Sequence, residues 1–431
     1  MKFTAAGDVL IQQQIPFKPK DFDTIKAYIE KGDARFFNLE TTLNYEGECC
    51  SNQISGGTYV RTNPESLYDF LKYGFNLTTF NNNHIMDFSY DGLLKTIEYA
   101  NRAGIKHSGV GRNLGEASAP CYLDTENGRV ALISFCVNNV LTNMAGEQTS
   151  RVKGRPGMNI LRRSEKLIVP AEDFDVIVRI GNNSGINAMN DTVRKEGYLP
   201  PLKEGIFDLG TLPFEKGDTY KYVLTPNEED LARAAREIYE AKLSADYVII
   251  SLHCHDQISA DKSDVPEFLE TVSHFFIDNG ANAVIGHGPH LLRAIEVYKD
   301  CPIFYSLGDF VLQLYSIAFA PAEFYRKNGL TPQATVHELL KKRSADFTRG
   351  LMEDRAMRET VIPYWETDEN GRLTHLELLP ITLMKEGANK SEWGLPALSE
   401  DTAFIEHLDK ISRPYGTTVT MENGIAVCRW K

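Results

Sequence analysis

The feature that most constrains this sequence is a regular alternation of short apolar runs with helical patterns. The apolar runs have the length and composition of buried β-strands, and amphipathic stretches at 227–244 and 265–279 precede the later ones. Strands that alternate with helices in this way predict a layered α/β core. The expected strands are residues 2–6, 35–39, 75–80, 129–136, 247–252 and 283–285.

Composition excludes several classes of protein. The 46 basic and 59 acidic side chains give a net charge of −13, which disfavours general nucleic-acid binding because that affinity depends on Lys and Arg. The seven cysteines contain no C-x-x-C pair and predict no disulfide framework. No leader sequence and no apolar run of about 18 residues are visible. We therefore expect a cytoplasmic chain without a membrane anchor, and the oligomeric state stays open.

Two irregular stretches interrupt the alternation. Residues 138–226 are rich in Asn and Gly, and residues 312–360 mix aromatic and charged side chains. Because a structureless loop of such length is rare inside a compact domain, we expect an insertion at 138–226, as a lid or a subdomain, and a second candidate lid at 312–360. We expect one catalytic domain over 1–385, with 373–378 as its last strand, and a C-terminal extension over 386–431 packed on the core.

Polar side chains that can bind a metal lie at the ends of five of these expected strands. In open α/β sheets, ligands collect at the carboxyl ends of strands, so segments on separate strands can converge on one crevice. The sequence therefore predicts one shared site. The five segments are Gly7-Asp8, Asn38-Leu39-Glu40-Thr41, Asn81-Asn82-Asn83-His84, Ser251-Leu252-His253-Cys254-His255-Asp256 and Gly286-His287-Gly288-Pro289-His290.

Three of these segments also have purely structural explanations. Gly7-Asp8 is typical of a turn, because Gly permits positive φ and Asp can bond its own backbone. Glu40 could be a surface carboxylate or a partner of a helix N-terminus. The asparagines before His84 could form an Asx-rich loop, with His84 as a buried, hydrogen-bonded histidine.

The two paired-histidine segments indicate a metal more directly. His253 and His255 lie two positions apart at the end of a strand, so both side chains point to the same face. His287 and His290 flank a Gly-Pro turn that leaves backbone room for an ion. Four of the ten histidines lie in these two segments, and imidazole is the commonest metal-ligating side chain.

The expected donors are imidazole, carboxylate and amide oxygen, without a cluster of thiolates. Such a set suits Zn, Mn or Fe in a hydrolytic site better than a structural zinc. We therefore expect one or two divalent ions. A pair about 4 Å apart that shares a bridging carboxylate would activate a water molecule for attack.

These segments and two further ones resemble the CapA family. Its members are capsule-biosynthesis or poly-γ-glutamate-synthesis proteins, related to the calcineurin-like metallophosphoesterases. The resemblance runs in order over roughly residues 1–385, which makes it more specific than any single motif. It rests on Asp8, NLET at 38–41, NNNH at 81–84 with Asp87 beyond it, SLH at 251–253, GHGPH at 286–290 and IFYSLGDF at 303–310.

The resemblance implies a fold and a distribution of roles. The fold would be a four-layer αββα sandwich, in which two sheets are flanked by helices and the metal centre lies at the strand ends. A general acid outside the metal ligands would protonate the leaving group. By family position, Asp8 and His290 would bind one metal, Asn83, His253 and His287 the other, Glu40 would bridge the two, and His84 would be the general acid.

The sequence departs from the family pattern at three places. Leu10 stands where related phosphoesterases usually have a histidine ligand. The segment that usually reads His-Trp-Gly with a glutamate two positions on is His253-Cys254-His255-Asp256-Gln257, so a carboxylate is lost and an imidazole gained. Asp309 replaces a more typical asparagine. These changes imply a weaker first metal site and an altered substrate wall that includes Asp309.

A basic cluster inside the 138–226 stretch has two explanations. Charged clusters are usually solvated, but a cationic lid could hold an anionic substrate over the metal centre of an acidic protein. Arg61 is a further candidate anion contact, or else forms a surface salt bridge. The cluster contains Arg151, Lys153, Arg155, Arg162, Arg163 and Lys166, of which Arg151 and Arg155 are the candidate substrate contacts.

Four functions are compatible with these residues. The favoured one is a metal-dependent hydrolase of an anionic, γ-glutamyl or other peptide-like substrate. The added imidazole of His255 instead suits a peptide epimerase, in which His84 and His255 would exchange a Cα proton. A phosphoesterase follows from the wider superfamily. A non-catalytic component of a capsule-assembly complex is the fourth alternative.

Overall fold

The computed structural model describes residues 1–137, 140–383 and 388–431. It separates into two compact units, one formed by Met1–Leu161 with Leu231–Lys431 and the other by Arg162–Asp230. The first two residues of the expected insertion, and the expected boundary between 385 and 386, lie outside the described residues.

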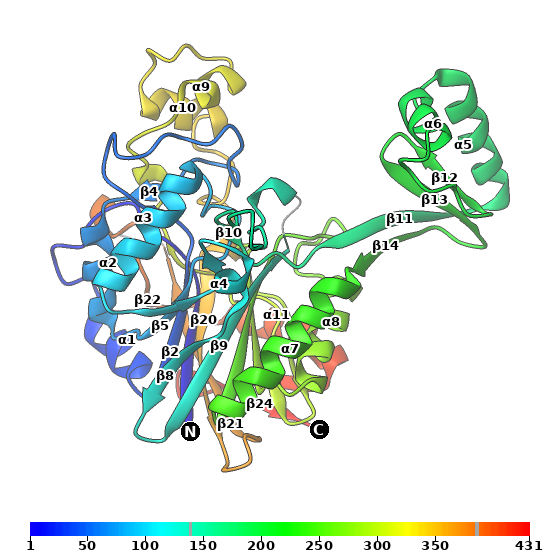
Figure 1. Ribbon diagram of the computed structural model, residues 1–431. Coiled ribbons are helices and arrows are strands. Elements are labelled where there is room, and N and C mark those ends of the chain that lie inside the picture. The colour runs from blue at the N-terminus through cyan, green and yellow to red at the C-terminus, as the bar shows by residue number, and fades with distance from the viewer. Residues whose placement is uncertain (138–139, 384–387) are drawn as a thin grey trace. The chain divides into compact units, whose positions relative to one another are not determined.

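Two β-sheets lie at the centre of the first unit (Figure 1). The larger runs in the order β23 (Thr417–Glu422), β24 (Ile425–Trp430), β21 (Leu373–Thr382), β20 (Glu359–Thr367), β1 (Lys2–Leu10), β2 (Ala34–Leu39), β5 (Leu77–Thr79) and β6 (Lys106–Ser108). β19 (Asp309–Leu312) also pairs with β1, and β22 (Ala397–Leu398) with β21. The smaller sheet runs β17 (Ile295–Tyr298), β18 (Cys301–Phe304), β16 (Ala283–His287), β15 (Tyr247–Cys254), β9 (Gly128–Val137) and β8 (Cys121–Thr125).

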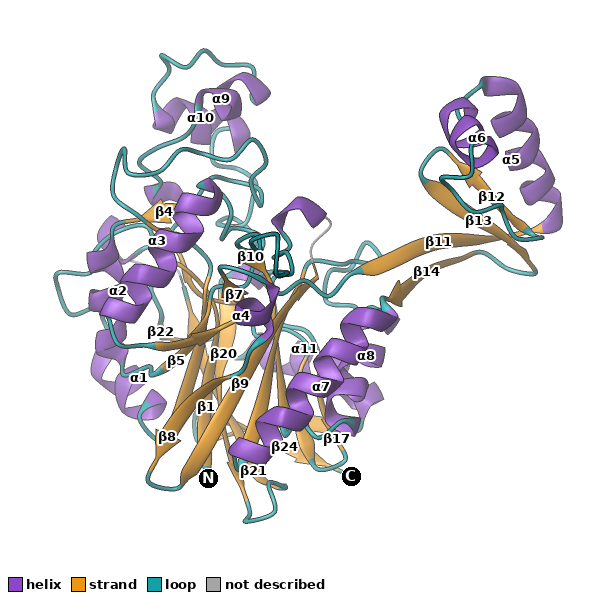
Figure 2. Ribbon diagram, in the orientation of Figure 1, coloured by secondary structure: helices purple, strands orange, loops and turns teal. Residues whose placement is uncertain are grey.

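Helices cover the outer faces of both sheets (Figure 2). Phe36 and Phe37 of β2 point to opposite faces, so Phe36 packs in the apolar cluster between the sheets, while the centre of the Phe37 ring lies 4.8 Å from that of Phe70. On the other side, Phe135 of β9 lies 5.1 Å from Phe276. The predicted four-layer α/β sandwich is thereby confirmed. The covering helices are α1 (Phe22–Ile29), α2 (Pro64–Phe70) and α3 (Ser89–Arg102) on one side, and α7 (Glu228–Ser244) and α8 (Glu267–Asp278) on the other.

β1 changes its neighbour part-way along its length. Residues 2–4 pair antiparallel with β20, whereas residues 8–10 pair parallel with β19. Between these two pairings, the Asp8 N–H donates to the Gly308 carbonyl at 2.9 Å. A Cβ on Gly7 would lie 1.9 Å from the same carbonyl oxygen. Only glycine allows the two backbones to approach so closely. The approach places Asp8 opposite Asp309 in the strand register.

The structure corrects two details of the expected strands. β1 extends to Leu10, so Asp8 lies inside the strand and not in a turn after it. The strand expected at 373–378 is not the last, because the hairpin of β23 and β24 pairs with it through Glu377 and Leu378. The C-terminal residues therefore extend the larger sheet, and α11 (Ala403–Ser412) precedes the hairpin.

The second unit has its own sheet and core. Its strand order is β12 (Ile206–Leu209), β13 (Leu212–Gly217), β11 (Arg163–Pro170) and β14 (Lys221–Pro226), with α5 (Ala171–Ser184) and α6 (Ala188–Lys195) as its helices. Val169, Phe174 and Phe214 form its buried centre. The second unit is shorter than the expected insertion at 138–226, because residues 140–161 belong to the first unit.

The stretch 312–360, expected as a second lid, carries two short helices of the first unit. They are α9 (Ala322–Lys327) and α10 (Val336–Arg343). Phe324, Tyr325 and Leu339 form a small apolar cluster with Tyr59. Within the described part of the chain, no helix combines the length and the apolar character that a membrane crossing needs. The expected cytoplasmic location stays a prediction.

Substitution of Gly7 by Ala tests the close approach of β1 to Gly308. The new Cβ would displace backbone atoms, so we expect the free energy of unfolding to fall by about 3 kcal/mol. Urea denaturation measures this change. The control is Gly115→Ala in α4 (Leu114–Ser118), where the nearest atom to the new Cβ is a side-chain oxygen at 3.3 Å. Equal stability of the two variants would contradict the predicted constraint.

Candidate metal centre

Side chains from both sheets meet at one buried site. Asp8 comes from β1 and Glu40 follows β2 in the larger sheet, while His253 belongs to β15 and His287 to β16 in the smaller one. All four are at most 1% exposed. Neighbouring parallel strands bring their carboxyl ends to the same edge, and the two sheets bring those edges together.

The first group of donors consists of Asp8, His253 and His287. The Nδ1 atoms of the two histidines lie 2.8 Å apart, and Asp8 Oδ1 lies 3.4 Å from His287 Nδ1 and 3.9 Å from His253 Nδ1. Ser251 Oγ lies 2.7 Å from His287 Nε2 and so fixes the ring through its other nitrogen. Three potential ligand atoms therefore face a common point.

The second group contains Asp8, Glu40, His290 and Asp309. His290 Nδ1 lies 3.8 Å from both Asp8 Oδ2 and Glu40 Oε2, and 2.9 Å from Asp309 Oδ1. The backbone of His290 has a φ of 63°, a value that is uncommon for residues other than glycine. The sequence placed Asp309 in the substrate wall, whereas here it stands among the donors. Asp8 belongs to both groups, and the bridging position that the resemblance implies for Glu40 stays a prediction.

A third group joins Glu40, His253 and His255. His255 Nε2 lies 3.1 Å from His253 Nε2, and Asn83 Oδ1 lies 2.7 Å from the same atom of His253. Asn83 donates its amide N–H to the Gly56 carbonyl at 3.0 Å, which turns the amide oxygen towards the histidines. His255 is exposed as a residue, so it borders the opening of the site.

The charges of the site fit a bound cation. Both carboxylate oxygens of Glu40, and Asp309 Oδ2, are buried without a hydrogen-bond partner among the described residues. Burial raises the pKa of Asp8 to about 7, and burial raises the pKa of Glu40 and of Asp309 well above their usual range. Buried carboxylates without partners are strongly disfavoured, and a divalent cation would compensate all three.

The histidines are held in the form that binds metals. Burial lowers the pKa of His287 to about 3, and burial lowers the pKa of His253 and of His290 as well. Their imidazoles are therefore neutral near pH 7, and neutral imidazole is the state that donates a lone pair to a metal. The donor set of nitrogens and carboxylate oxygens suits Zn, Mn or Fe.

The model of one protein family matches most of the chain. It describes the bacterial capsule synthesis protein PGA_cap and matches residues 2–314, a range that contains every donor named above. The chain belongs to this family. The resemblance to the CapA proteins seen in the sequence is thereby confirmed.

Individual relatives extend this comparison. The chain is 29% identical to the uncharacterised protein y4sH of Sinorhizobium fredii, over 99% of this chain and 92% of that protein. It is 23% identical to the PGA biosynthesis protein CapA of Bacillus subtilis, over 71% of this chain and 61% of that one. A probable polyglutamine synthesis accessory protein of Mycobacterium tuberculosis is also 23% identical, over 65% and 55%. Among solved structures, the NAD nucleotidase NadN of Haemophilus influenzae covers 95% of this chain and 61% of its own, with 8% identity and a TM-score of 0.31.

Two asparagines that the sequence did not single out hold Asp8 in place. Asn38 donates to Asp8 Oδ1 at 2.6 Å, and Asn82 donates to Asn38 Oδ1 at 3.0 Å. The Gly288 N–H donates to Asp8 Oδ2 at 2.9 Å. Asn38, Asn82 and Gly288 all lie in the motifs on which the family resemblance rests. In the sequence, only their position close to an expected ligand indicated their role.

His84 lies beside the donors without belonging to their groups. It follows Asn83 directly, and its Nδ1 lies 2.7 Å from Asp87 Oδ2. The Asp87 carboxylate also accepts the backbone N–H groups of Gly56 and Val60. The carboxylate fixes the imidazole so that Nε2 is the nitrogen left for another partner.

The contacts of the basic residues expected to bind substrate are with other parts of the chain. Arg61 donates to the Asn44 carbonyl, and its guanidinium lies 4.4 Å from the centre of the Phe319 ring. Arg155 donates to the Met144 carbonyl, and Arg151 is exposed. The expected basic cluster is divided, since 151–155 belong to the first unit and 162–166 to the second. Within the second unit, Arg162 pairs with Asp230 at 2.9 Å.

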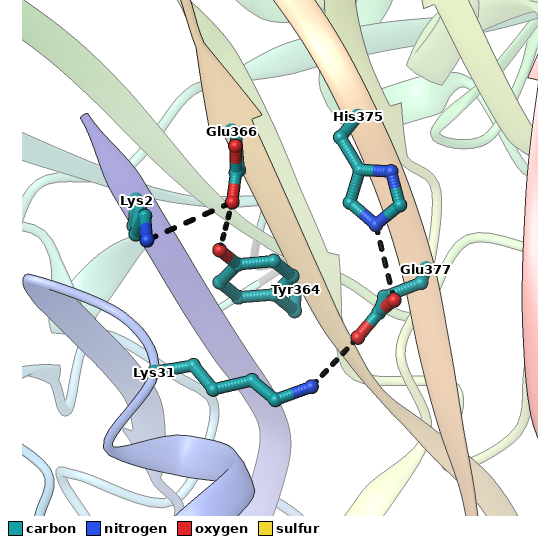
Figure 3. A pocket seen from close by; sticks show the side chains of 6 residues that line it. All are labelled: Lys2, Lys31, Tyr364, Glu366, His375 and Glu377. Atoms are coloured by element: carbon teal, nitrogen blue, oxygen red, sulfur yellow. Dashed lines mark hydrogen bonds and ion pairs between the residues drawn. The ribbon is translucent and has the colours of Figure 1, made fainter.

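A hollow of about 580 Å³ on β1, β20 and β21 lies away from the donors (Figure 3). Its charged side chains already pair with one another, as Lys31 does with Glu377 at 2.9 Å and His375 with Glu377 at 3.0 Å. Lys2 lines it, six residues before Asp8, which corresponds to about 20 Å along a strand. This hollow is therefore separate from the metal centre.

Substitution of Glu40 by Gln should affect stability and metal binding in opposite directions. Because burial disfavours the charged form of Glu40 and so raises its pKa, replacement by the neutral Gln should raise the free energy of unfolding of the metal-free protein at pH 7 by about 2 kcal/mol. Loss of a ligand should weaken metal binding by about 100-fold or more, since even outer partners of ligands contribute that much.

Chemical denaturation after chelation and competitive metal titration measure the two effects. The control is Glu369→Gln, which changes an exposed carboxylate on the turn between β20 and β21. A loss of stability in metal-free Glu40→Gln, or an unchanged metal affinity, would contradict the interpretation of Glu40 as a ligand.

Proposed function

We propose that this chain is a metal-dependent hydrolase that cleaves an amide or ester bond of an anionic, peptide-like substrate. The buried Glu40 carboxylate lies among converging donors and has no hydrogen-bond partner in the described part of the chain, and this observation carries the proposal. The names of the Bacillus and Mycobacterium relatives concern PGA biosynthesis and polyglutamine synthesis. They favour γ-glutamyl material as the substrate class.

Two ion positions follow from the donor groups. Asp8, His253 and His287 would hold one ion, with Asn83 beside them, and Asp8, Glu40, His290 and Asp309 would hold the other. A divalent ion at these positions would polarise the attacked carbonyl and lower the pKa of a bound water. Leu10 stands where a further ligand was expected, and Asp309 supplies an additional carboxylate at the same end of β1.

His84 would supply the proton for the leaving group. Its Nδ1 is occupied by Asp87, so a proton on Nε2 is the one that can pass to the leaving amine or alcohol. The Asp87 carboxylate would hold the imidazole ring in the orientation that this transfer needs. His84 is only 5% exposed, which limits competing exchange with bulk water.

An epimerase is the second candidate, because His255 adds a base that the family pattern lacks. His255 borders the opening, but its Nε2 lies 3.1 Å from that of His253 and within a donor group. In that position it serves as a ligand more readily than as a free base. Solvent deuterium in recovered, uncleaved peptide would favour the epimerase, and cleavage without exchange would favour the hydrolase.

The proposed substrate contacts are Arg61, Arg151 and Arg155, whereas Asp309 is now proposed as a metal ligand. A phosphoesterase and a non-catalytic assembly role remain alternatives. A substrate panel of γ-glutamyl peptides, phosphomonoesters and phosphodiesters, combined with metal analysis of the purified protein, separates them. We expect stoichiometric metal and cleavage of γ-glutamyl peptides. A protein without bound metal, or activity that survives both Asp8→Ala and His253→Ala, would overturn the proposal.

Substitution of His84 by Gln should slow the reaction without releasing metal. The loss of the proton donor is expected to lower kcat by about 100-fold to 10,000-fold. Asp87→Asn should lower kcat in the same direction, because the imidazole would lose its orienting carboxylate. The matched control is His407→Gln, on the exposed side of α11. Reduced metal content in His84→Gln would instead identify His84 as a ligand.

A further inference from the structure

A cavity of about 790 Å³ opens where β19 ends, and none of the metal donors is among the residues that line it. Aromatic side chains line much of it, together with two glutamines and a few charged groups at other points of the wall. The residues that matter for its chemistry are Gln313, Tyr315, His337, Phe347, Lys390 and Trp393.

Gln313 presents a fixed hydrogen-bond donor to this cavity. Its Oε1 accepts the backbone N–H groups of Gln12 and Gln13, at 2.9 and 3.2 Å. These two bonds fix the plane of the amide and leave its NH₂ group without a partner among the described residues. The residue is only 3% exposed to solvent and lines the cavity, so the donor is available there and not at the outer surface. An unused donor in such a place can bind an acceptor on a ligand.

The walls offer stacking surfaces. The Phe347 ring lies 5.0 Å from Tyr315, nearly perpendicular at 82°, and 5.3 Å from the His337 ring. Tyr315 is held by its hydroxyl, which donates to Glu353 at 2.6 Å. Lys390 lies 5.8 Å from the centre of the Trp393 ring. Rings held at such distances form edge-to-face contacts with a further aromatic group.

The backbone that carries Phe347 adopts an uncommon conformation. Ala345, Asp346 and Phe347 have consecutive positive φ values of 48°, 60° and 57°. Such values cost free energy in residues other than glycine, and they tend to occur at ligand-binding sites. Here the turn follows α10 and directs the Phe347 ring to the cavity.

The cavity is within reach of a substrate bound at the metal centre. Gln313 follows Asp309 by four residues along β19, which corresponds to about 13 Å, or the length of a short peptide. Gln12, which donates to Gln313, also donates through its side chain to Thr41 Oγ1 at 3.3 Å. Thr41 directly follows Glu40, so a short chain of contacts joins the donor Glu40 to Gln313 in the cavity wall.

The cavity also lies mostly beyond the region that the family shares. The family match ends at residue 314, and of the residues that line the cavity only Gln13 and Gln313 precede that point. The chemistry of the metal centre and the shape of this cavity are therefore set by different parts of the chain.

We propose that this cavity is a substrate subsite for an uncharged aromatic group that carries a hydrogen-bond acceptor for Gln313. Its size is that of small-molecule pockets, and its donor and rings match a planar group with a carbonyl beside it. A charged group would lose hydration against the rings and aliphatic side chains that line much of the wall. The assignment of the cavity as a substrate subsite rests on the proposed hydrolase function. The binding of an aromatic group to the cavity does not depend on that function.

Ligand binding without turnover tests the subsite. The chain has three tryptophans, so 5-fluorotryptophan labelling of the full protein gives few ¹⁹F resonances, and Trp393→Phe assigns the one in the cavity. The probes are benzamide, which has both ring and acceptor, cyclohexanecarboxamide, which lacks the aromatic ring, and indole, which lacks the acceptor. We expect saturable shifts of the Trp393 resonance with benzamide, and binding about tenfold weaker for the other two.

Two variants complete the test. Gln313→Glu keeps the oxygen that accepts the two backbone N–H groups but loses the NH₂ donor, so benzamide should bind about tenfold more weakly. Phe347→Ala should also weaken binding, whereas the control Phe17→Ala, at an exposed ring outside the cavity, should not. Absence of a saturable shift, equal binding of benzamide and cyclohexanecarboxamide, or unchanged binding in both cavity variants would overturn the subsite.

The proposed hydrolase function and the proposed subsite can be overturned independently of each other. Probe binding in a protein without hydrolase activity would overturn the proposed function and leave the cavity as a ligand site. Hydrolysis of γ-glutamyl peptides by a protein that binds no aromatic probe would overturn the subsite alone.

Discussion

The burial of three carboxylates in one place is the constraint on which the rest of the structure depends. Asp8, Glu40 and Asp309 lie together in the interior, and burial raises the pKa of each. Hydrogen bonds from Asn38 and Gly288 compensate only Asp8. The surrounding neutral histidines supply lone pairs, not positive charge, so a bound cation would compensate these carboxylates. Both sheets must be correctly aligned to form it.

The sequence predicted those residues of the site that lie at the ends of strands. The six expected ligands lie at or beside the ends of β1, β2, β5, β15 and β16, and the fold brings their side chains together because parallel strands share one edge. Asp309 was expected in the substrate wall. Its place among the donors depends on the pairing of β19 with β1 across some 300 residues, which local patterns do not encode.

Other features could not be predicted from the sequence, for similar reasons. The strands of the hairpin β23–β24 are short and half-polar. Their local sequence therefore does not indicate that they pair with the larger sheet. The basic cluster looked continuous between 151 and 166, but a boundary between two compact units passes through it. The aromatic cavity combines residues from four separate segments, and only tertiary packing joins them.

The second unit has a consequence for how the chain folds. β9 and β15 pair side by side although more than 100 residues of sequence separate their ends, and closing so long a loop is costly in entropy. At the base of the unit, the Asn227 N–H donates to the Arg162 carbonyl at 2.9 Å, and Arg162 also pairs with Asp230. Once Arg162–Asp230 has folded, its two ends are neighbours, and the loop that β9 and β15 must close is shortened by its whole length.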